Sequence, residues 1–174
     1  FRPLLFDVHH IPSPDRENSQ ESCLKKLGDL LEKRSSTIAA MIVEPMVQGA
    51  GGMRIQSVGF LEGIAKLCRE HDVLLIADEV MTGFGRTGTM FACEHAGISP
   101  DILCIAKGLT GGVIPLAATI ATEEIFQAFW GEDTHQAFLH GHSFTANPIT
   151  CAAALASLDL IESNNILSQV ATIS

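Results

Sequence analysis

Two short apolar runs, each followed at once by charged side chains, constrain the fold of this chain more than any other feature. The first run covers residues 73–77 and ends in Asp78 and Glu79. The second run covers residues 102–106 and ends in Lys107. Continuous apolar runs of this length are typical of parallel strands that are buried on both faces of a sheet. The charged residues therefore mark the carboxyl ends of two buried strands.

Segments with helical spacing of apolar residues separate these runs, and capping residues indicate where the helices begin. A third apolar run, residues 116–121, repeats the pattern of the first two and predicts another buried strand. The alternation of strand and helix predicts the α/β class in one domain without internal repeats. The expected strands are 38–43, 73–77, 102–106 and 116–121, and the expected helices are 20–34, 58–71, a helix that starts at 123 after Thr122, and 147–161.

Composition narrows the class of partner. The formal net charge is −9 without a block of Lys or Arg, so neither nucleic acid nor an anionic membrane surface is expected as a partner. Apolar runs stop long before the roughly 20 residues that a membrane-spanning helix needs. The five cysteines show no CxxC spacing, which favours a reducing, cytoplasmic location. The His140-Gly141-His142 cluster has no carboxylate or cysteine at ligand spacing, so we expect no metal site and a small-molecule substrate.

Asp78 and Lys107 are the candidates for chemistry, because functional groups in open α/β sheets collect beyond the carboxyl ends of the strands. A lysine at the end of an apolar strand is partly desolvated, which favours a neutral, nucleophilic amine. Enzymes that use pyridoxal phosphate (PLP) need such a lysine to form a Schiff base. They also need a carboxylate that keeps the pyridine nitrogen protonated. Position alone favours ordinary solvated residues at two strand ends, because charged residues are mostly exposed.

Six short segments distinguish these possibilities. They are residues 43–45 (VEP), 48–52 (QGAGG), 75–80 (LIADEV), 82–88 (TGFGRTG), 100–102 (PDI) and 106–112 (AKGLTGG). With these segments in this order, the chain resembles the class III (subgroup II) aminotransferases. The resemblance implies a fold-type I PLP-dependent transferase, whose large domain is a mostly parallel sheet flanked by helices.

The same resemblance implies a role for five residues. Lys107 would be the Schiff-base lysine and the group that moves the substrate's proton, and Asp78 would be the partner of the pyridine nitrogen. Val80 would pack against a face of the ring. Ser143, where the family commonly has threonine, would meet the phosphate from the other subunit of a homodimer. Glu44 stands where relatives place a carboxylate near the substrate amine, and a structural role at the end of its strand is equally consistent with the sequence.

Substrate choice is indicated by four further segments, residues 46–54, 91–96, 101–104 and 140–148. They are similar to family members that act in biotin biosynthesis, which implies amino transfer from S-adenosylmethionine to the keto acid 8-amino-7-oxononanoate, giving 7,8-diaminononanoate. Met81 departs from the glutamine that many ornithine-type relatives carry at this position. Alternatives are another class III enzyme, such as an ω-amino acid or ornithine-type aminotransferase or an aminomutase, and a non-catalytic interaction module.

A dinucleotide-binding interpretation of the GxGxxG at 83–88 is disfavoured, because Asp78 and Glu79 would face the pyrophosphate.

The resemblance also predicts how much of the enzyme this chain contains. The family's glycine-serine phosphate loop and its ring-stacking aromatic residue are expected before Phe1, and the small domain with its carboxylate-binding arginine is expected after Ser174. We therefore expect residues 1–174 to be the C-terminal half of the PLP-binding large domain, without the N-terminal segment and the small domain. Such a fragment is expected to be inactive by itself.

Overall fold

A four-stranded sheet lies at the centre of residues 6–173, the part of the chain that the computed structural model describes. Strands β1 (Ala40–Val43), β4 (Leu74–Asp78) and β5 (Ile102–Ile105) run parallel to one another, in the order β1-β4-β5. Strand β6 (Ala118–Ala121) adds to β5 in the antiparallel direction. The predicted α/β class with a mostly parallel sheet is confirmed.

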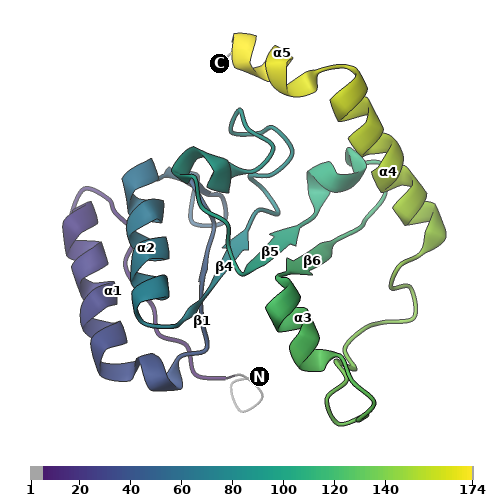
Figure 1. The fold of residues 1–174 in the computed structure, drawn as a ribbon. Helices are drawn as coiled ribbons and strands as arrows, with labels where there is room; N and C mark the ends of the chain where they lie inside the picture. Colours follow the sequence, from purple (N-terminus) through teal and green to yellow (C-terminus); the bar gives the residue numbers. More distant parts are fainter. Residues whose placement is uncertain (1–5, 174) are drawn as a thin grey trace.

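Two helices cover one flank of the sheet and enclose the larger of the two hydrophobic cores. Helices α1 (Gln20–Arg34) and α2 (Val58–Glu70) lie side by side there (Figure 1). Each begins at a serine N-cap, Ser19 or Ser57, whose hydroxyl accepts a hydrogen bond from the backbone N–H three residues on. The core combines buried residues of α1, α2, β1 and β4, including Leu27, Leu31, Leu61, Ile64, Val43 and Leu75.

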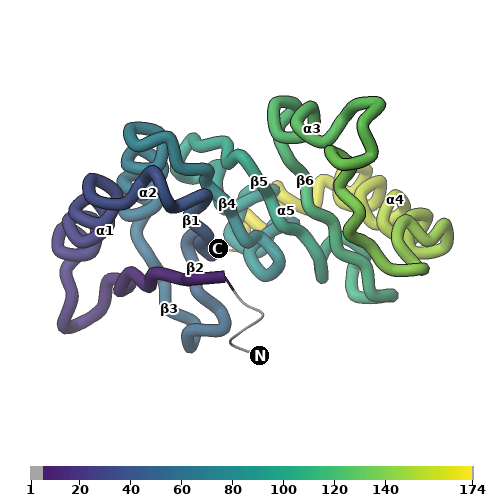
Figure 2. The backbone as a smooth tube through the Cα atoms, turned by 90° about the horizontal axis from the view of Figure 1, so that it is seen from below, coloured from purple at the N-terminus to yellow at the C-terminus, as the bar shows by residue number. Residues whose placement is uncertain are grey.

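Three helices follow the sheet in sequence, α3 (Glu123–Phe129), α4 (Pro148–Ser163) and α5 (Ile166–Ile173). Figure 2 shows α3 and α4 at the end of the molecule away from α1 and α2, with the strands between them. Asn147 caps α4, as expected, by accepting hydrogen bonds from Ile149 N (3.0 Å) and Thr150 N (3.4 Å). Helix α4 packs on η4 (Lys107–Thr110), a single 3-10 turn that follows β5 directly.

Short elements fill the connections. The glycine-rich residues 49–52 lie in the turn of a hairpin between β2 (Val47–Gln48) and β3 (Arg54–Ile55). The connection from β4 to β5 contains the 3-10 helix η3 (Ala92–Ala96), and η2 (Ser35–Thr37) follows α1. The hairpin lies between β1 and α2 in sequence, so it extends from the same sheet edge as the strand ends.

One expectation about burial is wrong. Residues 116–121 were expected to form a strand buried on both faces, but all four residues of β6 are exposed. The reason is topological, because β6 is the edge strand of the sheet within residues 6–173 and lacks a layer of described residues over its faces. Among those same residues, no helix combines the length and apolar character needed to cross a membrane.

Candidate active site

Asp78 and Lys107 meet at one edge of the sheet. Asp78 is the last residue of β4, and Lys107 begins η4 immediately after β5. Since β4 and β5 are parallel neighbours, with Asp78 in register with Cys104, their carboxyl ends emerge side by side. Both side chains line one cavity of about 360 Å³, called here the smaller cavity, together with Glu44, Gly49, Ala50, Val80 and Met81.

The donor set and size of the smaller cavity fit a PLP ring. Its volume of about 360 Å³ lies within the roughly 300–1,000 Å³ of small-molecule sites. The Asp78 Oδ1 atom accepts a hydrogen bond from Val80 N at 3.1 Å, and within residues 6–173 Oδ2 has no partner. Burial raises the pKa of the Cys104 thiol, and the neighbouring Asp78 carboxylate raises it further. A carboxylate with one free oxygen therefore faces the same space as the lysine amine.

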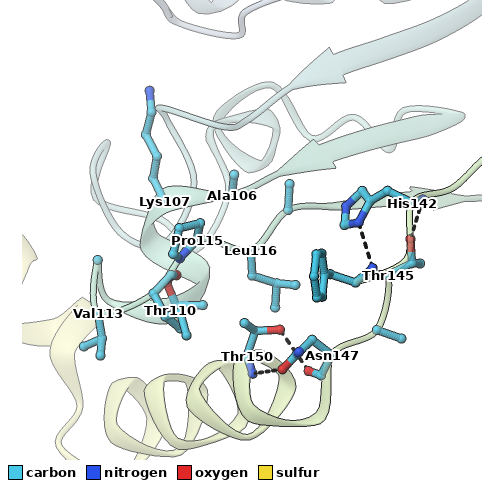
Figure 3. Close-up of a pocket in the computed structure, with 15 residues that line it drawn as sticks. Ala106, Lys107, Thr110, Val113, Pro115, Leu116, His142, Thr145, Asn147 and Thr150 are labelled. Carbon is cyan, nitrogen blue, oxygen red and sulfur yellow. Dashed lines mark hydrogen bonds between the residues drawn. The ribbon is translucent and has the colours of Figure 1, made fainter.

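Lys107 differs from expectation in its exposure. Its side chain is exposed in this chain, so the partial desolvation expected of a strand-end lysine is absent among the described residues. A second, larger cavity of about 890 Å³ also touches Lys107 and is lined by apolar and polar residues of the segments 106–117 and 142–150. Figure 3 shows the Lys107 side chain extending away from the other labelled residues of that cavity. Its amine is therefore directed away from the larger cavity.

Glu44 follows β1 and lines the smaller cavity with a half-buried side chain. Its Oε2 atom accepts a hydrogen bond from the backbone N–H of Gly49 at 2.7 Å. A Cβ at Gly49 would collide with Sδ of Met81, so a larger residue there would require the Met81 side chain to move. The sequence left a structural role and a role near the substrate as alternatives for Glu44. The structure shows both a structural hydrogen bond and a position in the cavity wall.

Ser143 is not brought to the other site residues. It is exposed in the connection between α3 and α4 and lines neither the smaller nor the larger cavity of the described chain. His142 and Thr145, its near neighbours in sequence, line the larger cavity instead. The prediction places Ser143 against the phosphate of another subunit, so its role stays a prediction.

Glu79 is a structural residue of the site that the sequence reasoning missed. Its side chain is fully buried, with 0% exposure. Its carboxylate accepts hydrogen bonds from Thr82 Oγ1 (2.5 Å), Ala92 N (3.0 Å) and Cys93 N (2.8 Å). Burial raises the pKa of the Cys93 thiol to about 12, and the Glu79 carboxylate contributes to that rise. The sequence did contain a signal for this role. Consecutive side chains of a strand point to opposite faces of the sheet, so only one of Asp78 and Glu79 can face the cavity.

The glycine-rich loop 82–91 lies between β4 and η3 and is held by Glu79. Phe84 N donates to Met90 O at 2.6 Å, which closes the loop on itself. Helix η3 begins only at Ala92, so the GxGxxG segment does not open a helix as a dinucleotide-binding turn would. Arg86 in this loop is exposed and forms no ion pair with a carboxylate of residues 6–173.

The described residues contain no group of three His, Cys, Asp or Glu side chains that could hold a metal ion.

Sequence comparison agrees with this site. The profile of the family described as aminotransferase class III matches residues 1–174. The chain belongs to the class III aminotransferase family. A relative from Geobacter sulfurreducens, named adenosylmethionine-8-amino-7-oxononanoate aminotransferase, is 49% identical over 181 residues, which cover 98% of this chain and 40% of the relative. This chain therefore spans about two fifths of the length of the curated relatives that it matches.

Solved structures of class III aminotransferases share the fold. The adenosylmethionine-8-amino-7-oxononanoate aminotransferase of Methanocaldococcus jannaschii superimposes with a TM-score of 0.86 at 43% identity, covering 97% of this chain and 39% of that one. An amine transaminase from an uncultivated Pseudomonas species, described in its PLP-bound form, gives a TM-score of 0.79 at 41% identity over 85% of this chain and 34% of its own. The fold-type I interpretation of the sequence is confirmed.

The buried contacts of Glu79 generate a stability prediction. Glu79→Gln keeps the shape of the side chain but replaces one acceptor oxygen with an N–H₂ group, so one buried donor loses its acceptor. We expect the free energy of unfolding to fall by about 1–3 kcal/mol, measured by urea unfolding followed by circular dichroism. The matched control is Glu94→Gln, because Glu94 is exposed and accepts one bond, from Phe91 N at 2.7 Å. An equal loss in both variants would show that the burial of Glu79 has no special effect.

Proposed function

We propose that this chain carries the cofactor-binding lysine of a PLP-dependent aminotransferase, with the cofactor held in the smaller cavity. The observation that carries the proposal is the convergence of Lys107 and Asp78 on one cavity of about 360 Å³. Membership in the class III family supports the same conclusion. Neither an interaction module nor a dinucleotide site requires a lysine and an aspartate that line the same ring-sized cavity.

Lys107 and Asp78 divide the chemistry between them. Lys107 would hold the cofactor through Nζ at its aldehyde, and the Lys107 amine would move the proton at the substrate's reacting carbon. Asp78 would hold the pyridine nitrogen through Oδ2 and stabilise the positive charge there. When bound, PLP supplies an electron sink for the carbanion that proton removal leaves.

The remaining predicted residues bind and orient. Val80, which lines the smaller cavity, would pack against one face of the ring. Glu44, already oriented by the Gly49 N–H, lies near the substrate ammonium and offers its second oxygen. Ser143 donates its hydroxyl to the phosphate of the partner subunit in a homodimer.

The proposed reaction is amino transfer from S-adenosylmethionine to 8-amino-7-oxononanoate, which makes 7,8-diaminononanoate for biotin synthesis. Several curated relatives, at 41–49% identity, carry the corresponding name. Met81 supports the assignment, since it occupies the cavity wall where ornithine-type relatives carry a polar glutamine. We also propose a cytoplasmic location, in keeping with five free cysteines.

A donor comparison tests the proposed reaction. The full-length protein, loaded with PLP, is expected to form 7,8-diaminononanoate from 8-amino-7-oxononanoate with S-adenosylmethionine as donor. Lysine is assayed in parallel as the alternative donor, and product is quantified by mass spectrometry. Residues 1–174 alone serve as the control and are expected to give no turnover. Failure with both donors would remove the biotin assignment while leaving the cofactor site intact.

The role of Asp78 generates a separate prediction. Asp78→Asn keeps the size and an acceptor oxygen but removes the charge that holds the ring nitrogen protonated. We expect kcat/KM to fall by at least about 100-fold, with the fall mainly in kcat. Asp159→Asn is the matched control, because Asp159 is exposed on α4 and far in sequence from the site. Full activity of Asp78→Asn would contradict the assignment of the carboxylate.

A further inference from the structure

We propose that Phe84 is a positioning residue for Lys107. Its side chain packs against the backbone turn from which the lysine side chain extends and holds that turn in its observed conformation. The inference rests on the proposed function, in which the Lys107 amine must reach the cofactor. It concerns a residue of the glycine-rich loop that touches neither the smaller nor the larger cavity among residues 6–173. Four observations carry it.

The backbone of Lys107 is in an unfavourable conformation. Its φ is +50°, in the left-handed region that lysine rarely adopts. Such conformations are energetically unfavourable and persist only where the surroundings impose them. The turn continues through Gly111, whose φ of +61° a glycine adopts without strain. Some packing interaction must therefore hold Lys107 in place.

One side of this turn is held by α4. Ser157 Oγ donates to the carbonyl oxygen of Gly108 at 3.4 Å, and Leu109 and Thr110 are buried. The Thr110 hydroxyl also donates to Ile114 O at 2.6 Å. These contacts fix η4 against α4 and against the segment that follows it.

Phe84 also contacts this turn. A Cβ built on Gly108 would lie 2.8 Å from both Cβ and Cδ2 of Phe84, so Phe84 packs directly on the backbone beside Lys107. Gly108 can accept this approach because it has no side chain. Phe84 also packs against the buried cluster of Ile105, Leu109 and the α4 residue Ala154. The ring therefore lies against both the backbone of the turn and the apolar residues around it.

Phe84 is itself held in place by the loop that Glu79 anchors. Its φ is +62°, also in the left-handed region, and its N–H is bonded to Met90 O at 2.6 Å. Its ring meets Phe91 edge to face, with centroids 5.7 Å apart at 67°. The residues after Phe91 donate their backbone N–H groups to the Glu79 carboxylate. Two non-glycine residues with left-handed φ angles, Phe84 and Lys107, thus both lie next to Gly108.

Removal of the Phe84 ring is expected to release the turn at Lys107. The backbone would relax toward more favourable dihedral angles, and the amine would then leave the geometry from which it bonds to the cofactor. Misplacement by about 1 Å costs up to 100-fold in reactions that depend on position. The effect passes through Lys107, so it should vanish when Lys107 has no amine.

A double-mutant cycle on the full-length protein tests this. The dissociation constant of PLP is measured by absorbance for the wild type, Phe84→Ala, Lys107→Ala and the double variant. We expect Phe84→Ala to weaken PLP binding at least tenfold (about 1.4 kcal/mol) when Lys107 is present. In the Lys107→Ala background, Phe84→Ala should change the affinity by less than about twofold.

Two further variants make the test specific. Phe84→Leu keeps Cβ, Cγ and a Cδ atom over Gly108, and its affinity should stay within about threefold of wild type. Gly108→Ala introduces a Cβ that collides with Phe84, and it provides the test should Phe84→Ala fail to fold. We expect it to weaken PLP binding at least tenfold, again only when Lys107 is present. Equal weakening in both backgrounds, or no weakening by Phe84→Ala, would overturn the positioning role alone. Equal affinity of wild type and Lys107→Ala would instead overturn the proposed function and this inference with it.

Discussion

Parallel pairing between β4 and β5 is the constraint on which the candidate site depends. Because the two strands run in the same direction and lie next to each other, the residues that follow them emerge at one edge. Asp78 and Lys107 are far apart in sequence, and this pairing alone brings them to one cavity. The β2–β3 hairpin, which follows the neighbouring strand β1, adds Gly49 and Ala50 to the same cavity.

Adjacent residues at the end of β4 have opposite functions. Asp78 faces the cavity with one carboxylate oxygen free, whereas Glu79 points to the other face and is fully buried. The Glu79 carboxylate is satisfied by one hydroxyl and two backbone N–H groups, so it fixes the loop without needing a positive partner. That loop carries Phe84 to the backbone of Gly108. Asp78 thus lines the cavity, while the adjacent Glu79 anchors the loop whose Phe84 packs beside Lys107.

The sequence predicted the elements well where the determining interactions are local. The bounds of α1 match residues 20–34, and the N-cap of α4 is the expected Asn147, because helical periodicity and capping depend on near neighbours. The exposure of β6 and of Lys107 was missed, since burial depends on which segments cover a strand. The resemblance to a family placed Asp78, Val80, Glu44 and Lys107 at one site, and the structure brings all four to one cavity. It gave no indication of Phe84 or Glu79, because their contacts run between segments distant in sequence.

The central claim is that Lys107 is the residue that bonds to the cofactor. The most direct test is to treat the full-length protein, isolated with PLP, with sodium borohydride, which makes a lysine–cofactor bond permanent. The protein is then digested, and the peptides are identified by mass spectrometry. The account predicts that the cofactor mass is found on the peptide that contains Lys107 and that Lys107→Ala removes it. Modification of a different lysine, or retention of the mass after Lys107→Ala, would contradict it.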